Sequence, residues 1–168
     1  GRGIGASAAR LFAQEGARVV VNDLNLEPTE EVADEINAAG GDALAIAGSV
    51  TDPAFPDQLM KTTIETYGKL NILVNNAGFT WDGVVHKMTD EQWLAILDVH
   101  ATAPFRMIRA ATPYMRDAAK AEQAAGGEVE PRCVINVSST SGLHGNFGQA
   151  NYATGKMGVI GLTKTIAK

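Results

Sequence analysis

Residues 1–23 read GRGIGASAARLFAQEGARVVVND, and this stretch decides the fold class. Glycines at positions 1, 3 and 5 are followed directly by a helical pattern that ends near Gly16. A strand is then predicted over residues 17–22 from the apolar run Val19-Val20-Val21, with Asp23 at its carboxyl end. A glycine-rich turn, a helix and a strand in this order are typical of an α/β fold.

Strands and helices continue to alternate along the rest of the chain. The strand runs are apolar throughout, which is typical of a parallel sheet buried on both faces. Thr51 or Asp52 is expected to cap the helix that ends at Gly68. We therefore predict one α/β domain, residues 1–168, with a parallel sheet. The expected helices cover residues 30–39, about 53–67, 89 to about 119 and 149 onward, and the expected strands cover residues 43–47, 70–74 and 133–137.

Size and composition exclude several classes of protein. The chain has 168 residues and a net charge of −5 from 14 basic and 19 acidic residues, with no basic run that would bind nucleic acid or an anionic membrane. No apolar stretch approaches the ~20 residues that span a bilayer. The single cysteine, Cys133, lies in an apolar run, so we expect a buried, inert thiol and a cytoplasmic protein. No metal site is predicted, because His86, His100 and His144 lack metal-ligand spacing.

The glycine turn and Asp23 form a candidate dinucleotide site. Glycines let the backbone approach a pyrophosphate, and the start of a helix supplies free N–H groups. Asp23 lies 18 residues after Gly5, at the end of the next strand, where an acidic side chain binds the adenosine ribose. Taken separately, the glycines are a flexible turn and Asp23 is a common turn residue. Taken together, they favour dinucleotide binding.

A second group of residues has the side chains needed for acid–base chemistry. Tyr152 and Lys156 are four residues apart in a predicted helix, so their side chains share one face. A free phenol is a poor base at neutral pH, but a neighbouring ammonium favours the phenolate. Ser138 and Ser139 lie upstream and offer hydroxyls to hold a substrate oxygen. The set suits interconversion of an alcohol and a ketone, although a Tyr–Lys pair alone also occurs on surface helices by chance.

These motifs, in this order, resemble those of the short-chain dehydrogenase/reductase family, and in pattern they are most similar to bacterial 3-oxoacyl-[acyl-carrier-protein] reductases. The resemblance covers almost the whole chain and implies a Rossmann-like, doubly wound parallel sheet. It rests on Gly1-Arg2-Gly3-Ile4-Gly5 as the end of the family's glycine turn, on Asn75-Asn76-Ala77-Gly78, on Ser139 thirteen residues before Tyr152, on the Tyr152–Lys156 pair, and on Gly148-Gln149-Ala150-Asn151 before the tyrosine.

The resemblance implies a role for each matching residue. Tyr152 would transfer the proton, Lys156 would favour its ionised form and hold the nicotinamide ribose, and Ser139 would orient the substrate oxygen. The substrate would be a small alcohol or ketone, or a 3-oxoacyl or 3-hydroxyacyl thioester. Twelve residues would contact the cofactor: Gly1, Arg2, Gly3, Ile4, Gly5, Asp23, Val50, Asn76, Ala77, Gly78, Tyr152 and Lys156.

Three features depart from the family pattern. His100 stands where the family usually has a catalytic asparagine; either it replaces that residue, or a backbone carbonyl serves there and the histidine is tolerated. Ser49 stands where the family often has an aspartate that contacts adenine, which leaves Val50 a backbone role. The connection Ala118–Glu130 is longer than usual, and we expect it either near a subunit contact or as surface filler.

The two candidate cofactors make opposite demands on the site. Asp23 repels the 2′-phosphate of NADP and favours NAD. Arg2 occupies a position where NADP-preferring relatives often carry a basic residue. We expect the carboxylate to outweigh the flexible arginine, so NAD is the predicted cofactor and NADP is the alternative.

The resemblance also implies that some family elements lie outside these 168 residues. The first strand and the C-terminal strands are not in this sequence, so we expect an incomplete domain that is inactive alone. The full-length protein is expected to be a homotetramer or homodimer, through the helices from Glu91 and Gln149. The alternative function is a catalytically silent dinucleotide-binding scaffold, or an oligomerisation module of the same fold.

Overall fold

The computed structural model describes residues 1–168, which form two compact units, residues 1–69 and residues 70–168. The first unit contains α1 (Gly3–Gln14), β1 (Arg18–Asp23), α2 (Leu26–Ala38), β2 (Asp42–Ala47) and α3 (Phe55–Tyr67). The second contains β3 (Ile72–Asn75), η1 (Val85–Lys87), α4 (Asp90–Leu97), η2 (Asp98–Thr102), α5 (Ala103–Thr112), η3 (Pro113–Asp117), α6 (Ala118–Ala124), β4 (Cys133–Asn136), α7 (Thr140–His144) and α8 (Ala150–Ile166).

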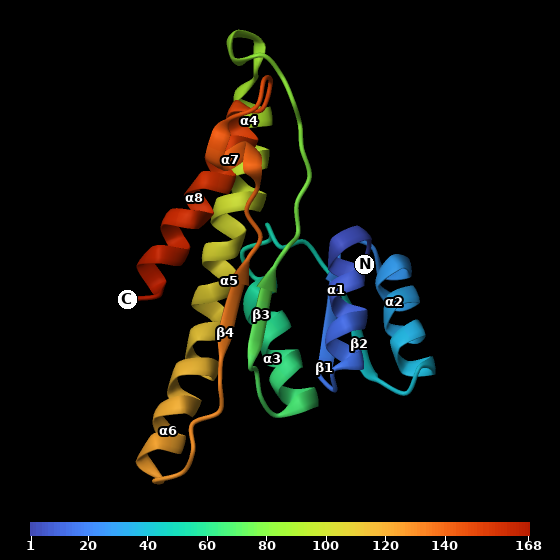
Figure 1. The fold of residues 1–168 in the computed structure, drawn as a ribbon. Coiled ribbons are helices and arrows are strands. Elements are labelled where there is room, and N and C mark those ends of the chain that lie inside the picture. Colours follow the sequence, from blue (N-terminus) through green and yellow to red (C-terminus); the bar gives the residue numbers. More distant parts are fainter. The chain divides into compact units, whose positions relative to one another are not determined.

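The first unit is built on a pair of parallel strands. β1 and β2 pair in register from Arg18 opposite Asp42 to Asp23 opposite Ala47. α1 and α2 lie against this pair (Figure 1) and bury a small apolar core. Its members come from both helices and from β1: Ala6, Ala9, Val21, Val32 and Ile36. The parallel βα arrangement predicted from residues 1–23 is therefore confirmed.

Two helix starts in the first unit differ from the prediction. α2 begins at Leu26 rather than at residue 30, because Pro28 fits the first turn of a helix, where its missing N–H costs nothing. Neither Thr51 nor Asp52 caps α3, whose N-cap is Ala54. Asp52 instead accepts the backbone N–H of Ala54 at 2.9 Å in the turn before the helix. The predicted stop is correct, since Gly68 ends α3 in the left-handed region at φ +78°.

The second unit is dominated by one long helical rod beside the parallel pair β3–β4. α4, η2, α5, η3 and α6 follow one another along this rod, and α8 lies against its first part (Figure 1). The two interruptions, η2 and η3, are wider π-type turns. Pro104 lies two residues after η2, and Pro113 is the first residue of η3; neither can donate to the carbonyl four residues earlier. The rod ends at Ala124, so α6 occupies the first half of the connection Ala118–Glu130.

One face of the β3–β4 pair is exposed in this chain, contrary to the prediction of strands buried on both faces. Ile72, Val74 and Ile135 are 41%, 37% and 38% exposed, whereas Leu73 on the opposite face is buried. Cys133 belongs to the exposed set, so the prediction of a buried thiol is wrong. The apolar run indicates that the segment is a strand, but it does not indicate which of the two faces of the strand the helices cover.

Candidate functional site

The glycine turn has the form of an anion-binding helix start. α1 begins at Gly3, and its N-cap Arg2 makes no side-chain cap, so the first N–H groups of the helix have no side-chain acceptor. Gly3 has a φ of +52°, which favours glycine. A Cβ on Gly1 would lie 2.7 Å from the carbonyl oxygen of Pro28, so only glycine fits there. These features suit a phosphate, which the positive end of the helix dipole attracts.

Asp23 lies beside this turn, at the carboxyl end of β1. Its Oδ1 accepts the N–H of Leu24 at 2.7 Å, and its Oδ2 lies 2.9 Å from the backbone nitrogen of Gly1. Partial burial raises the pKa of Asp23, whereas hydrogen bonds from the amides of Leu24 and Asn25 lower it. Asp23, ionised at neutral pH like any ordinary aspartate, is therefore an acceptor next to the glycine turn. Val50, the remaining cofactor candidate of this unit, is half-buried.

Tyr152 and Lys156 lie on one face of α8, as their spacing predicted. Lys156 is only 5% exposed, and its Nζ donates to the carbonyl of Val137 at 2.6 Å. The same Nζ lies 5.8 Å from the centre of the Tyr152 ring. Burial lowers the pKa of Lys156 below its usual value. A half-buried phenol thus lies beside a positive charge that the protein has largely removed from water.

Ser139 is the N-cap of α7, a short helix that the sequence analysis did not predict. Its Oγ accepts the N–H of Ser141 at 3.2 Å, which leaves the hydroxyl proton free to donate. α7 packs closely on α8 at Gly142: a Cβ at this position would lie only 2.9 Å from the backbone of Lys156. Ser138 ties the same loop to α8 by donating to the carbonyl of Lys156 at 2.7 Å.

His100 belongs to the same cluster as Tyr152 and Lys156. It lies in η2, is 2% exposed, and meets the Tyr152 ring edge-on with centroids 4.9 Å apart. Its Nε2 lies 2.8 Å from the carbonyl oxygen of Phe79. A carbonyl only accepts, so Nε2 bears the proton and the buried Nδ1 is an acceptor without a partner. Burial lowers the pKa of His100 despite the bond to Phe79, and the charge of Lys156 lowers it further.

The turn after β3 is shaped by this histidine. A Cβ on Gly78 would lie 2.2 Å from Cε1 of His100, far inside contact distance. A Cβ on Gly155 of α8 would lie 2.9 Å from the His100 Cβ. Two glycines, one in the turn and one in α8, therefore make room for one imidazole. Of the other residues of this turn, Asn75 donates to Asn136 Oδ1 at 2.8 Å. Asn76 is half-buried, and Ala77 is exposed.

One buried polar residue of the site, next to the tyrosine, was not predicted. Asn151 is fully buried and hydrogen-bonded to Trp81, Gln92 and Tyr152. The only signal in the sequence was its place immediately before Tyr152, which gives no information on burial.

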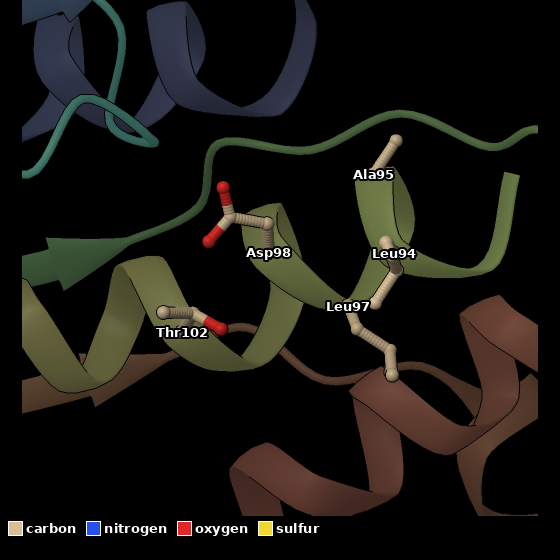
Figure 2. Close-up of a pocket in the computed structure, with 5 residues that line it drawn as sticks. All are labelled: Leu94, Ala95, Leu97, Asp98 and Thr102. Atoms are coloured by element: carbon tan, nitrogen blue, oxygen red, sulfur yellow. The ribbon is translucent and has the colours of Figure 1, made fainter. Parts of the chain in front are cut away.

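A surface hollow of about 440 Å³ lies on α4 and η2 of the rod (Figure 2). Leu94, Ala95, Leu97, Asp98 and Thr102 line it. None of the candidate catalytic residues is among them. Asp98 at its edge pairs with Arg106 at 3.4 Å.

The chain matches a known protein family over its whole length. The model of the short chain dehydrogenase family matches residues 1–168. The chain belongs to this family. It is 39% identical over 168 residues to the 3-oxoacyl-[acyl-carrier-protein] reductase of a Synechocystis species, and 42% identical over 171 residues to a hydroxyacyl-CoA dehydrogenase of Mycobacterium tuberculosis. These matches cover 99% of this chain and 64% and 53% of the two relatives. The predicted resemblance is confirmed.

Solved structures support the same assignment. A metagenomic short-chain oxidoreductase in complex with NADP superimposes with a TM-score of 0.88 at 33% identity, over 99% of this chain and 71% of that one. The Rossmann-like α/β fold is therefore confirmed. The chain spans less than two thirds of the length of the curated relatives that it matches, some of which are named as peroxisomal multifunctional enzymes. None of its helices is both long and apolar enough to cross a membrane.

Proposed function

We propose that the protein is a nicotinamide-dependent oxidoreductase that interconverts a secondary alcohol and a ketone. The observation that carries the proposal is the buried ammonium of Lys156 beside the ring of Tyr152, 5.8 Å from its centre. A buried charge stabilises an ionised neighbour far more than an exposed charge does. We further propose that the two units together form one cofactor-binding domain, which family membership supports.

Each candidate residue has one task in this reaction. The nicotinamide supplies or accepts the hydride when bound. During reduction Tyr152 gives its hydroxyl proton to the carbonyl oxygen, and during oxidation it takes the proton back. Ser139 donates its free hydroxyl proton to the same oxygen and fixes its orientation. Lys156 holds positive charge near the phenol and near the nicotinamide ribose.

His100 acts in this proposal as a neutral hydrogen-bond donor rather than as a proton relay. Its Nε2–H is engaged by Phe79, and the low pKa caused by burial keeps the ring neutral. It therefore fills the place of the usual asparagine by holding the turn after β3 against η2.

We propose NAD as the cofactor, held by the glycine turn residues 1–5, Asp23, Val50, Asn76, Ala77 and Gly78. The carboxylate of Asp23, at the end of β1 beside the glycine turn, repels a 2′-phosphate. NADP stays the alternative, since a solved relative binds it and Arg2 is exposed. The proposed substrate is a 3-oxoacyl or 3-hydroxyacyl thioester, because the two relatives described above are named for such substrates.

The test is the exchange of Tyr152 for phenylalanine in the full-length protein. Tyr152→Phe keeps the ring but removes the proton donor, so kcat with an acyl thioester and NAD(H) should fall by roughly 10²–10⁴-fold. Tyr114→Phe, the same change at an exposed tyrosine of the rod, should leave kcat unchanged. Full activity of Tyr152→Phe would refute the proposal. If the wild type binds NADH but turns over no substrate, the protein is the silent scaffold instead.

We also propose that the protein forms a homodimer or homotetramer through the rod and α8. Leu94, Phe105 and Met157 are 62%, 47% and 50% exposed on these helices, which is unusual for large apolar side chains in water. Light scattering of the wild type and of Leu94→Glu tests this proposal, and an unchanged monomer mass for both would contradict it.

The cytoplasm is the proposed location.

A further inference from the structure

Asn151, the residue before Tyr152, is completely buried and uses both polar atoms of its side chain. Its Nδ2 donates to the carbonyl oxygens of Trp81 and Gln92, each at 3.0 Å. Its Oδ1 accepts the backbone N–H of Tyr152 at 2.8 Å. Neither Asp, which lacks the donors, nor Leu, which lacks all three groups, could make this set of bonds.

The start of α8 depends on this side chain. The N-cap Gln149 makes no side-chain cap, although the first N–H groups of a helix have no partner within the helix. Asn151 supplies the missing acceptor from inside the first turn, and it does so at the N–H of Tyr152 itself. The bond therefore fixes the backbone of the proposed acid–base residue.

The partners of Asn151 belong to the segment that follows the turn after β3. Gly83 donates to the carbonyl of Gly148 at 2.8 Å, and Gln149 Nε2 donates to Asp82 at 3.1 Å. Gln92 is itself fixed, because its side chain and N–H form a capping box with Thr89 at the start of α4. Residues 81–92 and 148–152 are thus joined by several hydrogen bonds, and two of them come from the completely buried residue Asn151.

We infer that Asn151 is a positioning residue for proton transfer by Tyr152, an inference that rests on the proposed function. By holding the Tyr152 backbone against Trp81 and the first turn of α4, it sets where the phenol meets the substrate oxygen. Proton transfer needs heavy atoms within about 2.6–3.2 Å of each other. A displacement of the helix start therefore slows that step even when the protein stays folded and binds its cofactor.

The inference is tested with Asn151→Asp in the full-length protein. Aspartate has the same shape and keeps the acceptor for Tyr152, but it sets a carboxylate against two carbonyl oxygens. We expect kcat to fall at least tenfold, while the Kd for NADH stays within about twofold. The solvent deuterium isotope effect on kcat should rise, because proton transfer becomes the slower step. The matched control is Asn37→Asp, an exposed asparagine that bonds both backbone groups of Ala43, and it should behave as wild type.

Further variants separate the possible failures. Should Asn151→Asp not fold, Asn151→Gln keeps the donors and the acceptor on a longer side chain, and the same slow, isotope-sensitive proton transfer is expected. A folded variant with wild-type kcat and isotope effect overturns the inference. The inference is also overturned if kcat falls only in proportion to the fraction of protein that still binds NADH, because the residue would then have a purely structural role. If Tyr152→Phe is fully active, the proposed function itself fails; if only the Asn151 variants are unaffected, the positioning role alone is wrong.

Discussion

Gly78→Ala should be strongly destabilising, and His100 should be the cause. The new Cβ would lie 2.2 Å from Cε1, 3.0 Å from Nδ1 and 3.2 Å from Nε2 of the imidazole, and these are its three nearest atoms. The φ of Gly78 is not positive, so the backbone itself accepts alanine. Overpacking of this kind costs about 1–3 kcal/mol, and a contact this short favours the upper end, about 3 kcal/mol. For a protein of 150–250 residues this corresponds to roughly 6–12 °C in Tm.

A double-mutant cycle identifies the cause. In the His100→Ala background the ring is gone, so Gly78→Ala should cost less than about 0.5 kcal/mol, which leaves a coupling energy of roughly 2–3 kcal/mol. Guanidinium denaturation followed by circular dichroism measures all four proteins. Gly83→Ala is the control in the same segment, because its nearest atom would be at an ordinary 3.6 Å. An equal cost of Gly78→Ala in both backgrounds would refute the reasoning.

Three further predictions concern stability, helix packing and cofactor choice. Because burial lowers the pKa of His100, the unfolded chain below pH ~6.5 binds a proton that the folded protein does not. The free energy of unfolding should therefore be constant above pH ~6.5 and fall below it by up to ~1.4 kcal/mol per pH unit. Denaturation between pH 5 and 7.5 should show no such fall for His100→Asn, whereas His144→Asn, at an exposed site, should keep it. In α8, a Cβ on Gly161 would meet no atom within 4 Å, so Gly161→Ala should stabilise the protein by roughly 0.5–1 kcal/mol in thermal melts. Gly155→Ala should destabilise it, because its Cβ would meet His100. Stabilisation by both variants would show that His100 does not pack closely against α8. Asp23→Ser should reduce the ratio of kcat/KM for NAD(H) over NADP(H) at least tenfold, or ~1.4 kcal/mol, and a wild type that prefers NADP(H) would contradict the assignment of NAD.

Several features of the site could be predicted because they depend on neighbours in the chain. Tyr152 and Lys156 share a helix face since the period of the helix requires it. Thr89 begins α4 and Gly68 ends α3 because capping and positive φ are properties of a few adjacent residues. Asp23 ends β1 beside the glycine turn because one βα unit returns the chain to that edge.

Other features could not be predicted, because they arise where distant segments meet. Cys133 is exposed since helices cover only the other face of its strand, and a sequence pattern does not say which face that is. The contacts of the His100 ring with Gly78 and Gly155 depend on how the rod lies against α8 and the turn after β3.

By itself, then, the sequence determined the order of elements, the family and the residues that carry the proposed chemistry, because local periodicity and short motifs encode them. Tertiary structure alone decided what surrounds those residues. His100 bonds to a carbonyl 21 residues away, and Asn151 to one 70 residues away. Such bonds form only when packing brings the segments together, since a buried polar atom takes whichever partner the fold places within reach.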